Sequence, residues 1–470
     1  MNDTHTATND FDIIVIGSGP AGQKAAVQAA KANQRVALIE RDKFLGGACV
    51  HRGTIPSKTL RENALRVNNM RRNASLANFK LGEDVEMSTL IDRLDIVIKA
   101  HDEYMQKQIK RNGIECIHGR AQFIDATTLE ITPVKADKYR LTAAHIIIAS
   151  GSYPRTPNNI PIDHEHIFDS DSILSILYLP KSLTVLGGGV IASEYASIFQ
   201  ALGVKVTMID KYPLPLGFLD QDLTEKFIHS FETAGGTWVG NTEVISVEWN
   251  GVDSVDCRCD DGSIISSEKL LCAAGRIADV KNLQIKNAGL KLNKQSLISV
   301  DENLCTSVPS IFACGDVIGP PSLASTAMEQ GRRSSCNAIG LDTGQMGQVI
   351  PSGIYSIPEL SAVGLSEQQA QKQHDKVIVG RALFEEIARG QISGIQDGML
   401  KLICDEQGKK ILGVMIVGEG ATELIHIGQM AMLHEADVDI FVDTIFNFPT
   451  LAEAYRVAAL AVIGQRNAKA

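Results

Sequence analysis

The stretch Phe11-Asp-Ile-Ile-Val-Ile-Gly17-Ser-Gly19-Pro-Ala-Gly22 decides the fold of this chain. It starts as a short apolar run of the kind that forms a buried strand. The glycines then follow at the spacing of a dinucleotide-binding turn. In such a turn the first glycine permits the tight bend, the second lets the backbone approach a pyrophosphate, and the third lets a helix pack closely on the strand. The segment therefore predicts a strand–turn–helix unit whose helix N-terminus offers N–H groups to phosphate oxygens.

The residues downstream complete this nucleotide-binding unit. An alanine-rich helical stretch runs to about Asn33, and a second apolar strand, Arg35-Val-Ala-Leu-Ile-Glu40, ends on a carboxylate. We expect Glu40 to accept hydrogen bonds from a ribose. Because strand, turn, helix and carboxylate occur in the required order, a bound nucleotide explains the glycines better than a turn alone does.

The same pattern occurs a second time. The strand Leu183-Thr-Val-Leu186 precedes Gly187-Gly-Gly189-Val-Ile-Ala192 and a helical stretch, and Lys205-Val-Thr-Met-Ile-Asp210 supplies the next strand. Alanine is an accepted residue at the third position of the fingerprint. The two units together predict an α/β fold with two Rossmann-like dinucleotide-binding domains.

Composition excludes several classes of partner. The 470 residues are enough for two to four domains, and a net charge of -10 without a Lys/Arg cluster argues against nucleic acid or an anionic membrane. No apolar run approaches the ~18 residues of a membrane helix, and the polar start of the chain lacks the features of a secretory signal. The nine scattered cysteines predict reduced thiols in a cytoplasmic protein. Cys257 and Cys259, in an expected surface hairpin, lack histidine partners, so no metal site is predicted.

Several further segments resemble the flavin disulfide reductases, the family that includes dihydrolipoyl dehydrogenase and glutathione reductase. The loop Gly46-Gly-Ala-Cys-Val-His-Arg-Gly-Thr-Ile-Pro-Ser-Lys58 resembles their redox-active loop. The segment Phe446-Asn-Phe-Pro-Thr-Leu-Ala-Glu453 is similar to their His-Pro-Thr-x-x-Glu motif, and Thr306-Ser-Val-Pro-Ser-Ile-Phe-Ala-Cys-Gly315-Asp316 is similar to their second FAD motif. The resemblance extends over residues 10–465.

The resemblance implies where the domains begin and end. It assigns FAD to the first fingerprint and the nicotinamide coenzyme to the second. The FAD-binding domain is expected in two parts, residues 1–155 and 276–350, with the NAD(P)-binding domain at 156–275 between them. From residue 351 the pattern changes to a hairpin around 405–410 followed by helices at about 421–433 and 451–463. Residues 351–470 resemble the family's α+β dimerisation domain, which implies a homodimer or a larger homo-oligomer.

The resemblance also assigns the site residues. Lys58 is expected beside flavin N5, and Glu194 is expected to pair with that lysine; these two are the predicted catalytic residues. The predicted cofactor-binding residues lie in the two fingerprints, the loop after Glu40, the return linker and the second FAD motif: Gly17, Gly19, Gly22, Glu40, Arg41, Asp42, Lys43, Phe44, Leu45, Gly46, Gly47, Ala48, Cys49, Lys58, Gly187, Gly189, Ala192, Asp210, Gly275 and Asp316.

Two residues that the family uses for thiol chemistry are replaced in this chain. Cys49 holds the first cysteine position of the redox loop, but Thr54 holds the second, and a hydroxyl cannot form a disulfide. Phe448 stands where the family has its acid–base histidine. Cys49 is either an inert filler under the flavin, which we favour, or a peroxidase-type thiol that is oxidised to a sulfenic acid, with His51 as the one nearby base.

The intact nucleotide sites and the missing thiol groups together resemble the member of the family that passes hydride between NADPH and NAD+. The expected substrates are therefore NAD(H) and NADP(H), with FAD as the cofactor. The alternatives are an NAD(P)H oxidase or peroxidase, a quinone reductase, and a non-catalytic flavoprotein that acts as a redox sensor. Intact Lys58, Glu194 and both fingerprints argue against the last of these.

The preference between the two nicotinamides stays open. Asp210 suits the ribose 2′-hydroxyl of NAD and repels the 2′-phosphate of NADP. Lys211 follows it, and Lys205 and Lys181 lie near in the sequence, so cations that can meet a phosphate are available.

Two kinds of residue in the C-terminal segment are expected to be structural. We expect His426 to be a hydrogen-bonded core histidine of an apolar helix. Phe446, Phe448 and Tyr455 are expected in the core or at a subunit interface rather than stacked on a nicotinamide.

Overall fold

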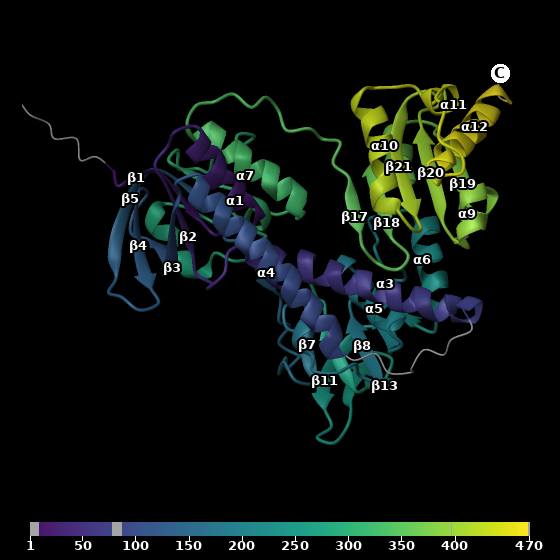
Figure 1. Ribbon diagram of the computed structural model, residues 1–470, viewed down its shortest axis with the longest axis horizontal. Helices are drawn as coiled ribbons and strands as arrows, with labels where there is room; N and C mark the ends of the chain where they lie inside the picture. Colours follow the sequence, from purple (N-terminus) through teal and green to yellow (C-terminus); the bar gives the residue numbers. More distant parts are fainter. Residues whose placement is uncertain (1–8, 78–86, 396, 469–470) are drawn as a thin grey trace, which may run out of the picture. The chain divides into compact units, whose positions relative to one another are not determined.

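The computed structural model describes residues 9–77, 87–395 and 397–468, and these form two compact units. Unit 1 comprises the described residues up to Thr59, Thr89–Arg155 and Gly275–Met346. Unit 2 comprises the described residues of 60–88, Thr156–Ala274 and the chain from Gly347. The elements of both units are labelled in Figure 1.

Unit 1 is built on a parallel sheet. β2 pairs with β1 and β3, and β1 and β16 both pair with β5, so the parallel strands lie in the order β3–β2–β1–β5–β16. An antiparallel strand, β4, joins β3 to β5. The bounds are β1 (Phe11–Ile16), β2 (Val36–Glu40), β3 (Glu115–Phe123), β4 (Thr128–Pro133), β5 (Tyr139–Ile148) and β16 (Ile311–Ala313).

Both faces of this sheet are covered, because alternate residues of each strand enter different cores. Ile14 and Ile16 lie in one apolar cluster, while Ile13 and Val15 lie in the other. Helix α1 (Pro20–Lys31) covers one face together with α7 (Ala324–Ala338). The two helices approach closely at Gly331 of α7, where a Cβ would lie 2.0 Å from the carbonyl oxygen of Ala21.

Short strands and helices, together with the long helices α3 and α4, are the other elements of residues 47–154 and 276–318. The antiparallel pair β6–β15 lies where residues 151–155 leave unit 1 and residues 275–278 return to it. The bounds are α2 (Gly47–His51), α3 (Thr54–Ala77), α4 (Met87–Arg111), β6 (Ser152–Pro154), β15 (Arg276–Ala278), η2 (Lys281–Leu283), η3 (Ile285–Ala288) and η4 (Gly315–Ile318).

Unit 2 contains the second parallel sheet, whose strands lie in the order β10–β9–β8–β14–β7. A three-stranded antiparallel sheet, β11–β12–β13, packs its apolar side chains against it. The bounds are β7 (Ile167–Asp169), η1 (Ile173–Ser175), β8 (Ser182–Leu186), α5 (Val190–Ala201), β9 (Lys205–Ile209), α6 (Gln221–Thr233), β10 (Thr237–Val239), β11 (Val244–Trp249), β12 (Val255–Cys259), β13 (Ile264–Ser267) and β14 (Lys269–Cys272).

The C-terminal part of unit 2 is an α+β segment around an antiparallel sheet in the order β17–β18–β21–β20–β19. Strands β20 and β21 form the hairpin expected around 405–410. The bounds are β17 (Ser352–Ile354), β18 (Leu360–Gly364), α8 (Glu367–Gln373), β19 (Ile378–Leu383), η5 (Phe384–Glu386), α9 (Ala388–Ser393), β20 (Met399–Cys404), β21 (Ile411–Val417), α10 (Ala421–Leu433), α11 (Ile440–Asp443) and α12 (Glu453–Asn467).

The structure confirms the predicted fold class and corrects two local expectations. Cys257 and Cys259 do lie in an antiparallel hairpin, on β12 between β11 and β13, but their side chains are 0% and 3% exposed instead of on the surface. Cys257 belongs to the apolar cluster beneath this sheet. Burial raises the pKa of the Cys257 thiol to about 12. His426 is exposed, and its Nδ1 lies 2.8 Å from Oε1 of Gln429, so the expectation of a core histidine is wrong. The buried residue of that turn is its neighbour Ile425.

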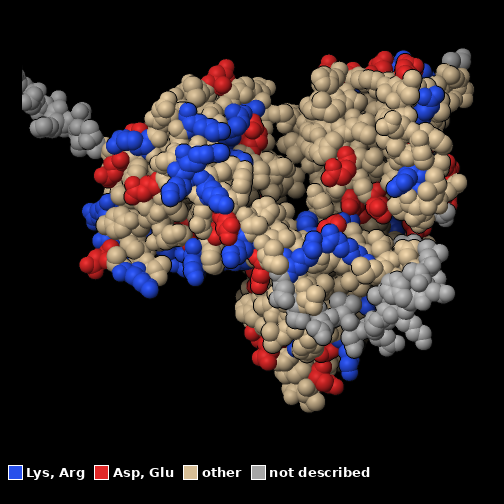
Figure 2. All heavy atoms as spheres, in the orientation of Figure 1, with Lys and Arg blue, Asp and Glu red and all other residues tan. Residues whose placement is uncertain are grey.

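The surface carries charges of both signs. Figure 2 shows acidic and basic side chains on the visible face of each unit, separated by wide areas of other residues. No described helix is both long and apolar enough to span a membrane.

Candidate functional site

The first glycine turn has the geometry of a phosphate cradle. Gly17 has a φ of 100°, and a Cβ at Gly22 would lie 1.8 Å from the Gly17 carbonyl oxygen, so both positions require glycine. A Cβ at Gly19 would meet nothing within 4 Å. Since no side chain caps α1, the N–H groups of its first turn stay directed outward.

Glu40 fixes this turn from the end of β2. Its carboxylate is 5% exposed and accepts hydrogen bonds from Ser18 N at 2.9 Å, Ser18 Oγ at 2.6 Å and Asp42 N at 2.8 Å. Ser18 Oγ in turn accepts from Gly46 N at 2.9 Å, which ties the turn to the redox loop. Ser18 was not predicted as a site residue, although it occupies a variable position inside the fingerprint. Contact of Glu40 with a ribose stays a prediction.

The predicted run after Glu40 is held by charged partners from other parts of unit 1. Arg41 forms an ion pair with Asp279, and Asp42 forms one with Arg52 at 2.8 Å. Lys43 lies 5.1 Å above the ring centre of Phe44, whose side chain is 47% exposed. The run thus presents an aromatic face and two cations on an ordered loop.

The run ends in a tight approach to the glycine turn. Leu45 is buried, and its N–H donates to Oδ1 of Asp102 at 3.1 Å. Gly46 and Gly47 both have positive φ, and a Cβ at Gly47 would lie 3.0 Å from Cα of Gly19. Ala48 and Cys49 follow in α2. The structure therefore brings the redox loop against the position where a pyrophosphate would bind.

The redox loop holds a neutral thiol without a base. Burial raises the pKa of Cys49 above the ordinary thiol range, although a hydrogen bond from Thr54 and the charge of Lys58 act in the opposite direction. His51 contacts the carbonyl oxygen of Leu45 through Nε2 at 2.6 Å, so this ring nitrogen already has a backbone partner. This arrangement favours the filler role for Cys49 over the peroxidase role.

Asp316 is positioned by two residues that the sequence did not indicate. Its Oδ2 accepts from Ser152 Oγ at 2.5 Å, and Ser152 accepts from Arg276 Nε at 2.9 Å. Gly315, beside it, donates its N–H to Oε1 of Gln330 on α7 at 2.9 Å. Asp316 therefore joins the linker strands β6 and β15 to the segment that resembles the second FAD motif.

The second glycine turn repeats the first with one difference. A Cβ at Gly187 would lie 2.9 Å from the carbonyl oxygen of Ala273, whereas Gly189 has open space. Ala192 takes the third position of this turn, where the first turn has Gly22, and its Cβ would lie 3.9 Å from a Cβ built at Gly187.

Asp210 closes this second turn as Glu40 closes the first. It accepts from Gly188 N and, at 3.0 Å, from Tyr212 N. Lys211 lies 5.4 Å above the ring centre of Tyr212, whose side chain is 61% exposed. The carboxylate of Asp210 and the ammonium of Lys211 thus belong to consecutive residues after the end of β9.

The remaining predicted residues lie in separate parts of the chain. Glu194, on α5 in unit 2, is 4% exposed and accepts from Tyr355 N at 2.9 Å. Lys58 belongs to unit 1, where its Nζ lies 3.4 Å from Ser57 Oγ. The Lys58–Glu194 pair stays a prediction. Gly275 has a φ of 97° in the return linker and open space around it.

The described residues fit the two nucleotides that the fingerprints predict. Each turn has one glycine with open space and a following helix whose N-terminus is not capped by a side chain. Thr326 Oγ1, in the first turn of α7, is buried without a partner among the described residues, as is expected of a hydroxyl that a cofactor would satisfy. In the same parts of the chain, no cluster of His, Cys, Asp and Glu is arranged to hold a metal ion.

Comparison with known proteins covers nearly the whole chain. The family profile described as pyridine nucleotide-disulphide oxidoreductase matches residues 11–331, and that of its dimerisation domain matches residues 350–459. A soluble pyridine nucleotide transhydrogenase of Mycobacterium bovis is 41% identical over 461 residues, covering 98% of each chain. One from Pseudomonas fluorescens is 39% identical over 464 residues, covering 96% of this chain and 98% of that protein.

Two solved structures share the architecture. LpdA from Mycobacterium tuberculosis has a TM-score of 0.88 and 26% identity, covering 95% of this chain and 99% of that one. The HOCl-induced flavoprotein disulfide reductase RclA from Escherichia coli has a TM-score of 0.86 and 27% identity, covering 96% and 99%.

Two of the three glycines of the first turn, Gly19 and Gly22, should respond differently to alanine. Gly22→Ala would place a Cβ 1.8 Å from the carbonyl oxygen of Gly17. Because of this clash, we expect the substitution to lower the free energy of unfolding by about 3 kcal/mol or more. Gly19→Ala has room in the protein but fills the approach to a pyrophosphate, so the FAD content should fall while the thermal stability of the apoprotein stays unchanged. Thermal melts and flavin absorbance measure both effects. Full FAD content in Gly19→Ala would contradict the cradle.

The Cys49 thiol should alkylate slowly at neutral pH. Because its pKa is raised, the thiolate that reacts with iodoacetamide forms only as the pH climbs past the ordinary thiol range. Thr54→Ala removes a hydrogen bond that lowers the pKa, so it should shift the pH–rate curve further upward. Peptide mapping of the alkylated protein between pH 6 and pH 10 separates Cys49 from the other thiols. Rapid labelling of Cys49 at about pH 7 would revive the peroxidase hypothesis.

Proposed function

Because this chain belongs to the pyridine nucleotide-disulphide oxidoreductase family, we propose that it is an FAD-dependent transhydrogenase that passes hydride between NADPH and NAD+. The observation that carries the proposal is the redox loop, where Cys49 faces a threonine instead of a second cysteine and has a raised pKa. The chain thus keeps both nucleotide turns but has no disulfide to pass electrons to a thiol. The soluble transhydrogenases at 41% and 39% identity support the same activity.

The residues of this chain bind and orient the reactants. Bound FAD would supply the centre that takes hydride from one nicotinamide and gives it to the other. The turn at Gly17–Gly22 would hold its pyrophosphate, and Asp316, oriented by Ser152, would fix the chain that leads to the ring. Lys58 is proposed to lie beside the ring and to offer a positive charge there. Glu194 is proposed as its counter-ion, which would hold both groups ionised.

One coenzyme pocket is proposed to serve both nicotinamides in turn. Asp210 would accept a hydrogen bond from the ribose of NAD(H), while Lys211 would meet the 2′-phosphate of NADP(H). Because the two residues are consecutive on the same loop, either coenzyme would find a partner there. The two nicotinamide couples have similar potentials, so their concentrations would set the direction.

The dimerisation domain is proposed to form a homodimer in the cytoplasm. Several large apolar side chains of this segment are exposed in the single chain, including Phe448 at 72% and Ile445 at 94%. Exposed apolar area of this kind marks protein–protein contact surfaces. The family's dimerisation profile covers the same residues, which supports a second copy of this chain as the partner.

Transhydrogenation should be directly measurable and should follow a ping-pong pattern. Without oxygen, NADPH should bleach the flavin absorbance, and thio-NAD+ should restore it, giving parallel initial-rate plots. Asp210→Asn keeps one acceptor oxygen for the turn but removes the charge. It should weaken NAD(H) by ~1–2 kcal/mol and leave NADP(H) equal or better. Asp261→Asn, an exposed acid between β12 and β13, is the matched control. A wild-type protein that refuses NADP(H) but consumes oxygen with NADH would be an oxidase instead.

Thiol substrates should not turn over. Dihydrolipoamide and glutathione disulfide need a redox disulfide and a proton donor, and Thr54 and Phe448 occupy those positions. Thr54→Cys alone should not restore activity, because Phe448 still leaves the thiolate without a proton donor. Lipoamide-dependent NADH oxidation by the wild-type protein at family-typical rates would contradict the proposal.

A further inference from the structure

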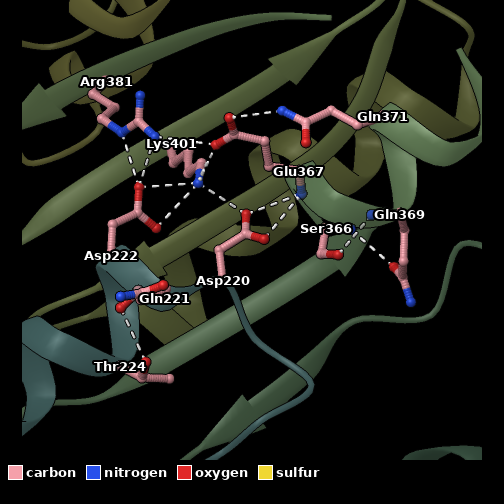
Figure 3. Close-up of polar contacts among 10 residues, drawn as sticks. All are labelled: Asp220, Gln221, Asp222, Thr224, Ser366, Glu367, Gln369, Gln371, Arg381 and Lys401. Carbon is pink, nitrogen blue, oxygen red and sulfur yellow. Dashed lines mark hydrogen bonds and ion pairs between the residues drawn. The ribbon is translucent and has the colours of Figure 1, made fainter. Parts of the chain in front are cut away.

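Unit 2 contains a buried cation that the proposed function does not use. Lys401, in the middle of β20, is 1% exposed, and all residues of that strand are buried. Its Nζ lies 2.9 Å from Asp220, 2.9 Å from Asp222 and 2.8 Å from Glu367. Figure 3 shows the three carboxylates converging on this one ammonium. A buried ammonium of this kind requires its partners, because burial without them would be strongly unfavourable.

Two of these carboxylates belong to the chain segment that follows the second fingerprint. Asp220 and Asp222 lie at the start of α6, at the far end of the loop that begins at Asp210. Glu367, at the start of α8, donates its N–H to both oxygens of Asp220 at 3.0 Å. Arg381, on β19, also binds Asp222, with Nε at 2.9 Å from Oδ2. The cluster therefore fastens one end of the 210–220 loop to the antiparallel sheet.

The other end of the loop is fastened to the glycine turn. Asp210 accepts from Gly188 N, and the Leu216 N–H donates to the Gly188 carbonyl at 2.7 Å. Trp238 covers the middle of the loop and donates from Nε1 to the Pro213 carbonyl at 2.9 Å. Both hydrogen-bonding groups of the Gly188 backbone are thus used by the loop.

The loop conformation is imposed by these contacts. Leu216 has a φ of 52°, a left-handed conformation that leucine rarely adopts, and its side chain is 2% exposed. It packs in an apolar cluster with other residues of the loop and α6 and with the antiparallel sheet: Leu219, Leu223, Phe227, Ile354, Leu360, Met399, Met415 and Val417. Apolar packing and the charged cluster both press the same loop against the same sheet.

We propose that Lys401 is a positioning residue for the coenzyme site: through Asp220 and Asp222 it holds the 210–220 loop, and with it Asp210, Lys211 and Gly188, in the conformation that binds nicotinamide coenzymes. The inference rests on the proposed function only in assigning the coenzyme to the second fingerprint. The antiparallel sheet, in a segment matched by the dimerisation profile, thereby sets the shape of a binding loop that lies in the preceding profile. Since the loop carries the groups for both coenzymes, loss of Lys401 should affect both.

The test compares Lys401→Met with Lys401→Arg in the FAD-loaded protein. Calorimetric titration with NAD+ and NADP+ should give a Kd about tenfold higher for the methionine variant, with most of the affinity kept by the arginine variant. The limiting rate of flavin bleaching should change less than about twofold, because the loop binds the coenzyme and does not act at the reacting atoms.

Asp439→Asn is the matched control for stability. Asp439 binds Arg466 at 2.8 Å and Lys409 at 2.7 Å in the same C-terminal segment, but neither partner touches the loop. We expect this variant to lower the melting temperature with an unchanged Kd. An unchanged Kd in Lys401→Met as well would reduce Lys401 to a structural role and overturn the proposal.

Trp238 gives a readout that needs no coenzyme. The chain has two tryptophans, so Trp249→Phe leaves Trp238 as the sole reporter of the loop. Lys401→Met should increase acrylamide quenching of Trp238, whereas Asp439→Asn should not. Unchanged quenching overturns the proposal whatever the activity of the protein. A wild type that binds NAD+ but not NADP+ removes the transhydrogenase function alone, and the NAD+ titrations then decide this inference. A wild type that binds neither overturns both.

Discussion

Hydrogen bonds from glycine turns to strand-end carboxylates hold both nucleotide sites in shape. Glu40 accepts from the backbone and hydroxyl of Ser18, and Asp210 accepts from the backbone of Gly188. Because each carboxylate is bound to the turn that it faces, the turn cannot relax away from its strand. The following helix therefore begins with N–H groups that no side chain caps, and we propose that these groups bind a pyrophosphate. Asp316, through Ser152, and Lys401, through Asp220 and Asp222, bind other segments of the same two nucleotide units.

The sequence predicted the turns because their requirements are local. Position 22 requires glycine because of the carbonyl of Gly17, only five positions earlier. Both residues belong to the same short motif, so the sequence of the motif is enough to predict the requirement. Ser152 and Asp316 are 164 residues apart, and Lys401 and Asp222 are 179 apart, so only the folded chain could show these contacts. The wrong expectation for His426 has a related origin. The apolar composition of a helix predicts that one face is buried, but it does not determine whether a given residue lies on the buried face or on the exposed face.

The redox loop shows how a small change in sequence removes one chemistry and leaves another. Thr54 stands where the family pattern has a second sulfur, and it forms a hydrogen bond with Cys49 but cannot form a disulfide with it. Burial then keeps the remaining thiol protonated, and His51 is engaged with the Leu45 carbonyl. A thiol in this state neither attacks peroxide readily nor competes for hydride. The loop can therefore serve as packing beside the flavin while the nicotinamide chemistry continues.

A pocket that serves two coenzymes in alternation needs a loop that is rigid instead of adaptable. If the 210–220 loop reshaped itself for each coenzyme, part of the binding energy would be spent on reordering it at every half-reaction. In this chain the loop is fixed at both ends, by Gly188 on one side and by the buried ammonium of Lys401 on the other. Asp210 and Lys211 are thereby presented together in one conformation. Under the proposed function, discrimination would depend on which of these two charged residues a coenzyme meets.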